Sequence, residues 1–302
     1  MTSLKVNIAG LRLKNPSMVA SGIMDETGDS MLHMMECGAG AVVTKSIGLE
    51  PRDGHGNPTL VELEYGYINS MGLPNPGIDA FAEEMGIAVR GGVTVIGSIF
   101  ASSEGDFAVL AGRMEDMGAS AVELNLSCPH ASGYGMEIGI DPVVVKAIVA
   151  SVKDATCIPV FSKLTPNTHR LVDIGNAVQE AGGDGVVAIN TLKAMAISPE
   201  FARPVLRNGF GGLSGPALKP VGVRAIFDLH SVLDIPLVGV GGIETWRDAA
   251  EYIMAGASAF QVGSAVGRKG PRVLQEICNG LEDFMRRHGY ASVQDMMGVA
   301  HE

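Results

Sequence analysis

The chain has 302 residues, of which 46% are hydrophobic and 18% charged, and its formal net charge is -11 at pH 7. This length and hydrophobic content suffice for a large core, and one α/β barrel covering residues 1–302 is the most economical single-domain fold. The negative charge disfavours nucleic acid and anionic membranes as partners, since both need basic patches, and favours a small-molecule ligand.

Membrane, export and metal signals are missing from the sequence. No apolar run approaches the 18 or more residues of a membrane span, and residues 1–10 hold no signal-peptide core, so we expect a cytoplasmic protein. The four cysteines lie far apart without metal-ligand spacing. We therefore predict no metal site, and any redox chemistry must use another cofactor.

The chain opens with a predicted β-hairpin. Apolar and polar residues alternate in 4–8 and again in 11–13, on either side of Ala9 and Gly10. We expect this hairpin to close the bottom of a barrel.

Short apolar runs then alternate with helical segments. The predicted strands are 17–21, 41–45, 93–98, 121–125, 159–163, 185–190, 236–240 and 259–263. The predicted helices, from 3.6-residue apolar spacing, include 78–90, 107–117, 142–154, 171–181, 221–230 and 246–255. Eight such units predict an α/β fold of the (β/α)8 TIM-barrel type, with a doubly wound open sheet as the alternative.

Two connections, 46–77 and 192–213, are too long for simple βα loops. Both are rich in Gly, Pro and Asn. Loops of that length in a compact domain are usually functional or disordered, and we expect both on the catalytic face.

Polar residues stand at the carboxyl ends of the predicted strands. They are Ser21, Lys45, Ser98, Asn125, Lys163 and Asn190, followed by Gly241-Gly242 and Gly263-Ser264 after the last two strands. The carboxyl ends of barrel strands carry active sites, and glycine turns after the seventh and eighth strands bind phosphate through backbone N–H groups. The pattern predicts a phosphorylated cofactor across the barrel mouth.

Cys128 follows one of these strand ends by three residues. A free cysteine is often a small buried hydrophobe, but this position lies at the expected mouth of the barrel. Because the neighbouring strands also end in polar groups, we interpret Cys128 as a candidate catalytic residue. An isolated lysine such as Lys163 is ordinarily a surface residue. Because polar residues stand at the ends of several neighbouring strands, we place Lys163 in the site as well.

These residues carry a family resemblance. The motifs Thr44-Lys45-Ser46, Asn69-Ser70-Met71-Gly72-Leu73-Pro74-Asn75, Asn125-Leu126-Ser127-Cys128-Pro129, Lys163-Leu164-Thr165-Pro166, Asn190-Thr191 and Val240-Gly241-Gly242 resemble those of the dihydroorotate dehydrogenases. Members of that family oxidise (S)-dihydroorotate to orotate on bound FMN, in pyrimidine biosynthesis. A proton leaves C5 and a hydride leaves C6 for the flavin.

The resemblance also implies roles for individual residues. Cys128 matches the C5 base, and cysteine there marks the class 1 enzymes. The implied substrate residues are Lys45, Asn69, Ser70, Met71, Gly72, Leu73, Asn125, Asn190 and Thr191. The implied FMN residues are Ser21, Lys45, Ser46, Ser98, Asn125, Lys163, Ile189, Gly215, Gly241, Gly242, Gly263 and Ser264.

Two positions depart from the family pattern. Ser98 and His130 stand where members often have asparagine. The resemblance therefore does not decide whether Ser98 contacts the flavin or whether His130 contacts the substrate. Class 1 includes homodimers that reduce fumarate and heterotetramers that reduce NAD through a separate subunit with FAD and a [2Fe–2S] cluster. Residues 133–139 resemble the NAD-linked class 1B, so we expect a homodimer core bound to that subunit.

Two other functions stay open at this point. A dihydropyrimidine dehydrogenase-type flavin barrel would act on uracil or thymine. A barrel without flavin could be an aldolase that forms a Schiff base through Lys163.

Overall fold

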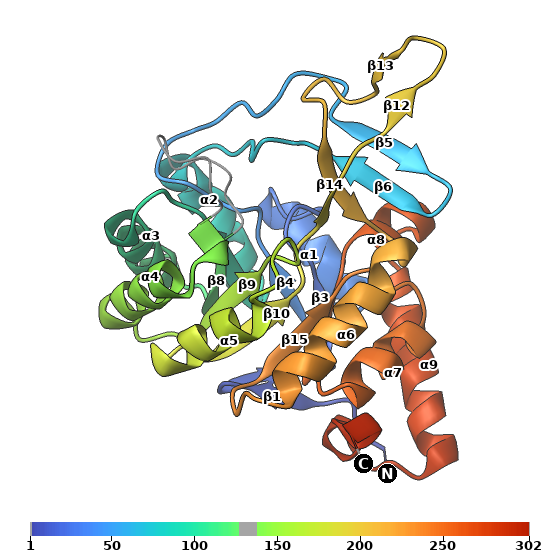
Figure 1. Ribbon diagram of the computed structural model, residues 1–302. Helices are drawn as coiled ribbons and strands as arrows, with labels where there is room; N and C mark the ends of the chain where they lie inside the picture. Colours follow the sequence, from blue (N-terminus) through green and yellow to red (C-terminus); the bar gives the residue numbers. More distant parts are fainter. Residues whose placement is uncertain (1, 127–137, 302) are drawn as a thin grey trace.

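The computed structural model describes residues 2–126 and 138–301, and its centre is a closed barrel of parallel strands (Figure 1). In barrel order the strands are β3 (Ser17–Val19), β4 (Ala41–Val43), β7 (Val95–Ile99), β8 (Ala121–Asn125), β9 (Val160–Leu164), β10 (Gly185–Ala188), β15 (Leu237–Val240) and β16 (Ala259–Val262). The barrel closes because β16 pairs with β3 in parallel. The TIM-barrel prediction is confirmed, and the open-sheet alternative is wrong.

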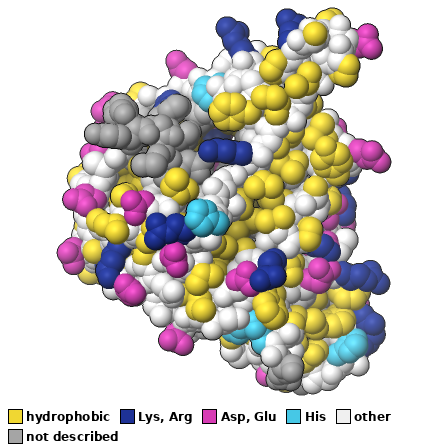
Figure 2. Space-filling view, in the orientation of Figure 1, with side chains coloured by type: hydrophobic (Ala, Val, Ile, Leu, Met, Phe, Trp, Pro, Cys, Tyr) yellow, Lys and Arg dark blue, Asp and Glu magenta, His cyan; other side chains and the backbone are white. Residues whose placement is uncertain are grey.

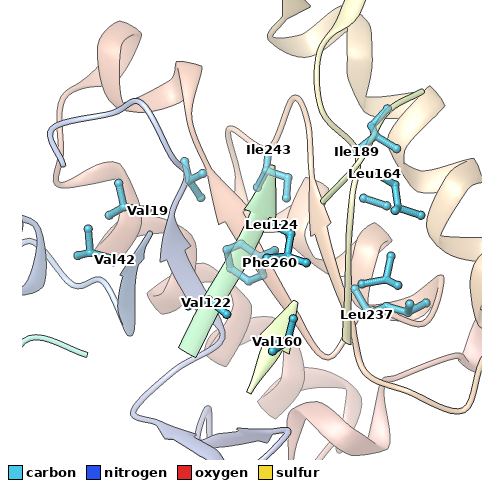
Figure 3. Close-up of a cluster of buried hydrophobic side chains, with 14 of the residues drawn as sticks. Val19, Val42, Val122, Leu124, Val160, Leu164, Ile189, Leu237, Ile243 and Phe260 are labelled. Carbon is cyan, nitrogen blue, oxygen red and sulfur yellow. The ribbon is translucent and has the colours of Figure 1, made fainter. Parts of the chain in front are cut away.

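The barrel strands are mostly apolar because both of their faces are covered. Outward side chains such as Val42, Leu124 and Phe260 pack in one buried cluster with the surrounding helices (Figure 3). Inward side chains such as Met18 and Ile96 form a second buried cluster. This double burial explains why the runs lack the alternation typical of strands with one solvated face.

Helices surround the barrel in the described part of the chain. They are α1 (Gly28–Glu36), α2 (Ile78–Arg90), α3 (Glu104–Asp116), α4 (Pro142–Ala155), α5 (Leu171–Glu180), α6 (Lys219–His230), α7 (Trp246–Met254), α8 (Ser264–Lys269) and α9 (Val273–His288). Short 3-10 turns cover Ile138–Ile140, Pro216–Leu218, Val293–Asp295 and Val299–His301. The six predicted helices occur within three residues of the predicted bounds. Helix α3 begins earlier than predicted because Ser103 caps it, accepting from the Asp106 N–H at 3.2 Å. No helix in these described ranges is long and apolar enough to cross a membrane.

The N-terminal hairpin closes one end of the barrel. Strands β1 (Val6–Ile8) and β2 (Leu11–Leu13) pair antiparallel around Ala9 and Gly10, both of which have positive φ. Ile8 and the leucines of β2 belong to the same buried cluster as the inward-facing barrel side chains. The predicted hairpin is therefore confirmed, and it lies at the end opposite the strand carboxyl termini (Figure 1).

The two long connections form a second sheet above the barrel (Figure 1). Its order is β11 (Leu192–Ala194), β14 (Gly211–Ser214), β6 (Gly66–Asn69) and β5 (Leu60–Leu63). A small arm, β12 (Ile197–Ser198) and β13 (Arg203–Pro204), extends from it. Pairing joins segments far apart in sequence, for example Asn69 with Gly212. Both connections thus lie at the carboxyl ends of the barrel strands, as expected for a catalytic face.

Candidate active site

A chain of hydrogen bonds crosses the barrel mouth and joins the polar strand ends. Ser46 Oγ lies 3.3 Å from Ser21 Oγ and 2.9 Å from Ser98 Oγ, and it accepts from Asn125 Nδ2 at 3.1 Å. Asn125 Oδ1 in turn accepts from Asn190 Nδ2 at 3.3 Å. Five barrel strands or the residues just after them contribute to this chain, so the structure brings these predicted residues together. Ser98 is fully buried beneath Ser46.

A cavity of about 250 Å³ lies between the barrel mouth and the second sheet. Eight of the nine predicted substrate residues line it: Asn69, Ser70, Met71, Gly72, Leu73, Asn125, Asn190 and Thr191. The ninth, Lys45, lies deeper at the end of β4 and is buried. Its Nζ is 3.6 Å from Glu26 Oε1.

The other half of the cavity is lined by eight residues that are not among the predicted substrate or FMN residues. They are Arg52, His55, Asn167, Lys193, Asn208, Phe210, Gly211 and Gly212. Asn167 Nδ2 donates to the Thr191 carbonyl at 3.1 Å, and Asn167 Oδ1 accepts from Lys193 N–H at 2.8 Å. Asn167 follows the Lys163-Leu164-Thr165-Pro166 motif closely, and that proximity was the available signal. Arg52 and His55 carried none, because only pairing across the second connection places them at the cavity.

A buried carboxyl group lies behind the loop that follows β3. Asp25 Oδ2 accepts from the Gly22 N–H, and the buried Oδ1 has no hydrogen-bond partner within residues 2–126 and 138–301. Burial raises the pKa of Asp25 to about 7, although the Gly22 hydrogen bond and the charge of Lys45 oppose this shift. Asp25 is thus a titratable group next to the predicted flavin contacts.

Lys163 sits inside the barrel just below the mouth. Its Nζ donates to Glu123 Oε1 at 3.3 Å and to Gln261 Oε1 at 3.1 Å. Neither partner was singled out from the sequence. Both belong to buried strands, where a polar residue in an apolar run was the available signal.

Glycine turns form a close cradle after β14 and β15. Gly215, Gly241 and Gly242 all have positive φ, and a Cβ at position 242 would lie 2.7 Å from the Gly215 carbonyl oxygen. Tyr252 Oη, from α7, donates to the Gly241 carbonyl at 2.8 Å and holds the turn. The nearby Lys219 already pairs with Asp248 and Glu251 at 2.9 and 2.7 Å. Anion binding here would therefore rest on backbone N–H groups.

Of the remaining predicted residues, the structure places three. Gly263 and Ser264 lie where β16 passes into α8, and Ile189 is buried after β10. Cys128 and His130 lie outside the described residues.

Comparison with known proteins decides the family. The family model described as dihydroorotate dehydrogenase matches residues 3–285. This chain belongs to the dihydroorotate dehydrogenase family.

Within this family, two similar relatives carry the name of the NAD(+)-dependent form B. The chain is 52% identical, over 98% of its length and 97% of the relative, to the Dihydroorotate dehydrogenase B (NAD(+)), catalytic subunit of Pyrococcus horikoshii. It is 50% identical, over 99% of both chains, to the protein of the same name from Thermoplasma acidophilum. These similarities confirm the predicted class 1B group of dihydroorotate dehydrogenases.

A solved structure supports the fold of this dihydroorotate dehydrogenase family member. The crystal structure of DHODH from Eimeria tenella in complex with ferulenol matches with a TM-score of 0.85, covering 99% of this chain and 89% of that one. The sequence identity is 24%, so this match bears on the fold alone.

Proposed function

We propose that this protein oxidises (S)-dihydroorotate to orotate, with FMN as the hydride acceptor and Cys128 as the base that takes the C5 proton. The observation that carries the proposal is the cavity, because eight predicted substrate residues from three separate chain segments line it together. About half of the residues are identical to those of catalytic subunits of dihydroorotate dehydrogenase B, and this identity supports the same reaction.

The side chains of the cavity suit the substrate's chemistry. Dihydroorotate has a ring with alternating N–H and C=O groups and a carboxylate. Asparagine amides both donate and accept, and Asn69, Asn125 and Asn190 supply three of them. The ammonium of Lys45 would favour the substrate carboxylate and the thiolate form of a neighbouring cysteine.

The barrel mouth fits FMN. The cradle of Gly215, Gly241 and Gly242 leaves no room for a Cβ at position 242 and offers backbone N–H groups to a phosphate. Ser21, Ser46, Gly263 and Ser264 would complete the contacts at that side, and Lys163 would face the ring region where charge accumulates on reduction. Bound FMN would supply a two-electron acceptor for the hydride.

The two other functions have less support. A Schiff-base aldolase needs Lys163 as a neutral amine, whereas here Lys163 forms an ion pair with buried Glu123. A uracil- or thymine-reducing barrel would have no carboxylate to bind, and it would not explain a buried lysine beside the cavity.

We further propose that electrons leave through a separate subunit carrying FAD and a [2Fe–2S] cluster, which reduces NAD, and that two copies of this chain form the core of the assembly. Large exposed apolar side chains support a protein partner. Ile197 and Phe201 on the β12–β13 arm are 60% and 71% exposed, and Figure 2 shows hydrophobic side chains over this part of the molecule. A cytoplasmic location stays a prediction.

Anaerobic mixing of the purified holoprotein with dihydroorotate tests cofactor, substrate and direction together. The flavin absorbance should bleach with dihydroorotate and persist with dihydrouracil. Protein that is colourless after reconstitution with FMN, or flavin that bleaches only with dihydrouracil, would contradict the proposal.

A further inference from the structure

A polar cluster of three residues lies inside the barrel below the candidate site. Glu123 comes from β8, Lys163 from β9 and Gln261 from β16, and their exposures are 1%, 7% and 1%. Lys163 Nζ donates to both partners, at 3.3 Å to Glu123 Oε1 and at 3.1 Å to Gln261 Oε1. Gln261 Nε2 donates to Glu123 Oε2 at 2.5 Å. The three side chains therefore form a closed ring of hydrogen bonds.

The surroundings of this cluster are apolar. A small internal crevice is lined by Glu123 and Gln261 together with Met18, Ile96, Phe161, Val187 and Val238. Layers of branched apolar side chains normally fill a TIM barrel at this depth. Burying an ion pair costs desolvation energy that the mutual attraction often fails to recover, so stability does not explain the cluster.

The cluster is continuous with the candidate site. Lys163 is the register neighbour of Asn125, which lines the cavity and bonds to Ser46. Glu123 precedes Asn125 by two residues on the same strand, so both side chains face the barrel interior. The lysine thus stands between the buried carboxylate and the mouth of the barrel.

The hydrogen bonds leave the lysine one donor for a ligand. An ammonium group has three N–H donors, and among the described residues two oxygens accept from Lys163 Nζ. Both oxygens of Glu123 and both polar atoms of Gln261 are used within the ring. The ring fixes the ammonium in place, and Glu123 offsets its charge.

We propose that Glu123 is a positioning residue that acts through Lys163 to set the reduction potential of bound FMN. This inference rests on the proposed function, since it requires FMN at the barrel mouth.

The sign of the effect follows from the charge balance. Oxidising dihydroorotate transfers a hydride, which is two electrons and one proton, to the flavin, while the second proton leaves C5 for the base. The reduced ring then carries one more negative charge than the oxidised ring. A cation beside the ring favours reduction and raises the potential, whereas a carboxylate behind that cation opposes it.

The experiment measures the midpoint potential of the flavin in holoprotein by dye-equilibrated reductive titration. Glu123→Gln keeps the size of the side chain and removes its charge, so the potential should shift upward. Gln261→Glu adds a second carboxylate beside the same ammonium, so the potential should shift downward. Asp184→Asn is the matched control, because it removes the carboxylate of another lysine–carboxylate pair, 2.6 Å from Lys153, at the other end of the barrel. It should leave the potential unchanged.

A double variant tests whether Glu123 acts through the lysine. The upward shift caused by Glu123→Gln should shrink in a Lys163→Met background, because the positioned charge is then gone. A shift of equal size in both backgrounds would overturn the positioning role. If Glu123→Gln fails to bind flavin, the flavin potential of Gln261→Glu tests the proposal by itself: a downward shift supports it, and an unchanged potential overturns it.

Failure of this inference can be separated from failure of the proposed function. The proposed function would be contradicted if the wild-type protein binds no FMN, or if dihydroorotate does not reduce the bound flavin. A different result would overturn the role of Glu123 only. In that case the wild-type protein passes both tests, but the flavin potentials of Glu123→Gln and Gln261→Glu equal that of Asp184→Asn.

Discussion

Asn125 donates its side-chain amide to Ser46 Oγ at 3.1 Å, although 79 positions separate the two residues in the chain. The bond joins the end of β8 to the residues after β4 across the mouth of the barrel. It shows how parallel strands gather polar side chains from distant segments into one site, because all their carboxyl ends open on the same face.

The proposed base can be tested by Cys128→Ser. A serine hydroxyl ionises far less readily than a thiol, so dihydroorotate should reduce the flavin roughly 10²-fold more slowly at pH 7. The rate should recover as the pH rises. Stopped-flow flavin absorbance gives the rate, and orotate titration checks that binding is retained. Reduction at the wild-type rate at pH 7 would remove Cys128 from this role.

The amides of the cavity should contribute to substrate binding. Asn190→Ala removes an amide that donates to Asn125, and the loss of about 1–2 kcal/mol should raise the Kd for orotate roughly 10-fold. Isothermal titration measures the Kd. Asn208→Ala is the control, because Asn208 lines the same cavity but is exposed. Equal affinities in the two variants would argue against a substrate contact at Asn190.

The glycine cradle should be essential for flavin affinity. Gly242→Ala places a Cβ 2.7 Å from the Gly215 carbonyl and forces a non-glycine residue to φ +68. Strain of roughly 1–3 kcal/mol should weaken FMN binding about 10- to 100-fold, as measured by fluorescence titration of the apoprotein. Gly182→Ala has a similar positive φ with open space around it, far from the mouth. If both variants bind FMN equally well, backbone strain at position 242 does not affect the cofactor site.

Asp25 should make the stability of the ligand-free protein depend on pH. Burial raises its pKa from 3.8 to about 7 in the folded state, so folding favours the protonated form. Its stabilising contribution is complete below pH 3.8 and is lost as the pH rises through 7. The difference of about three pKa units corresponds to at most roughly 4 kcal/mol.

The variant Asp25→Asn isolates this contribution, because it keeps an acceptor for the Gly22 N–H. We expect its free energy of unfolding, from urea titration, to exceed that of the wild type at pH 8 and to approach it at pH 4. Parallel pH profiles for the two proteins would show that Asp25 is not the group responsible.

The amino-acid sequence by itself determined the barrel and the family. Runs such as 41–43 and 236–240 are apolar throughout because strands buried on both faces need no alternation, and this local property is readable without a structure. The Asn69–Leu73 and Asn125–Pro129 motifs likewise identified the family and most of the cavity's predicted substrate residues, since each is a continuous stretch of chain.

Tertiary structure alone decided which distant residues meet. The second sheet pairs Asn69 with Gly212, and this pairing places His55 and Phe210 at the cavity, although short strands in long connections carry weak local signals. The contact of Glu123 with Lys163 and Gln261 depends on the register and closure of the barrel. Register is a property of the whole sheet, since each strand's position is fixed by the packing of all its neighbours.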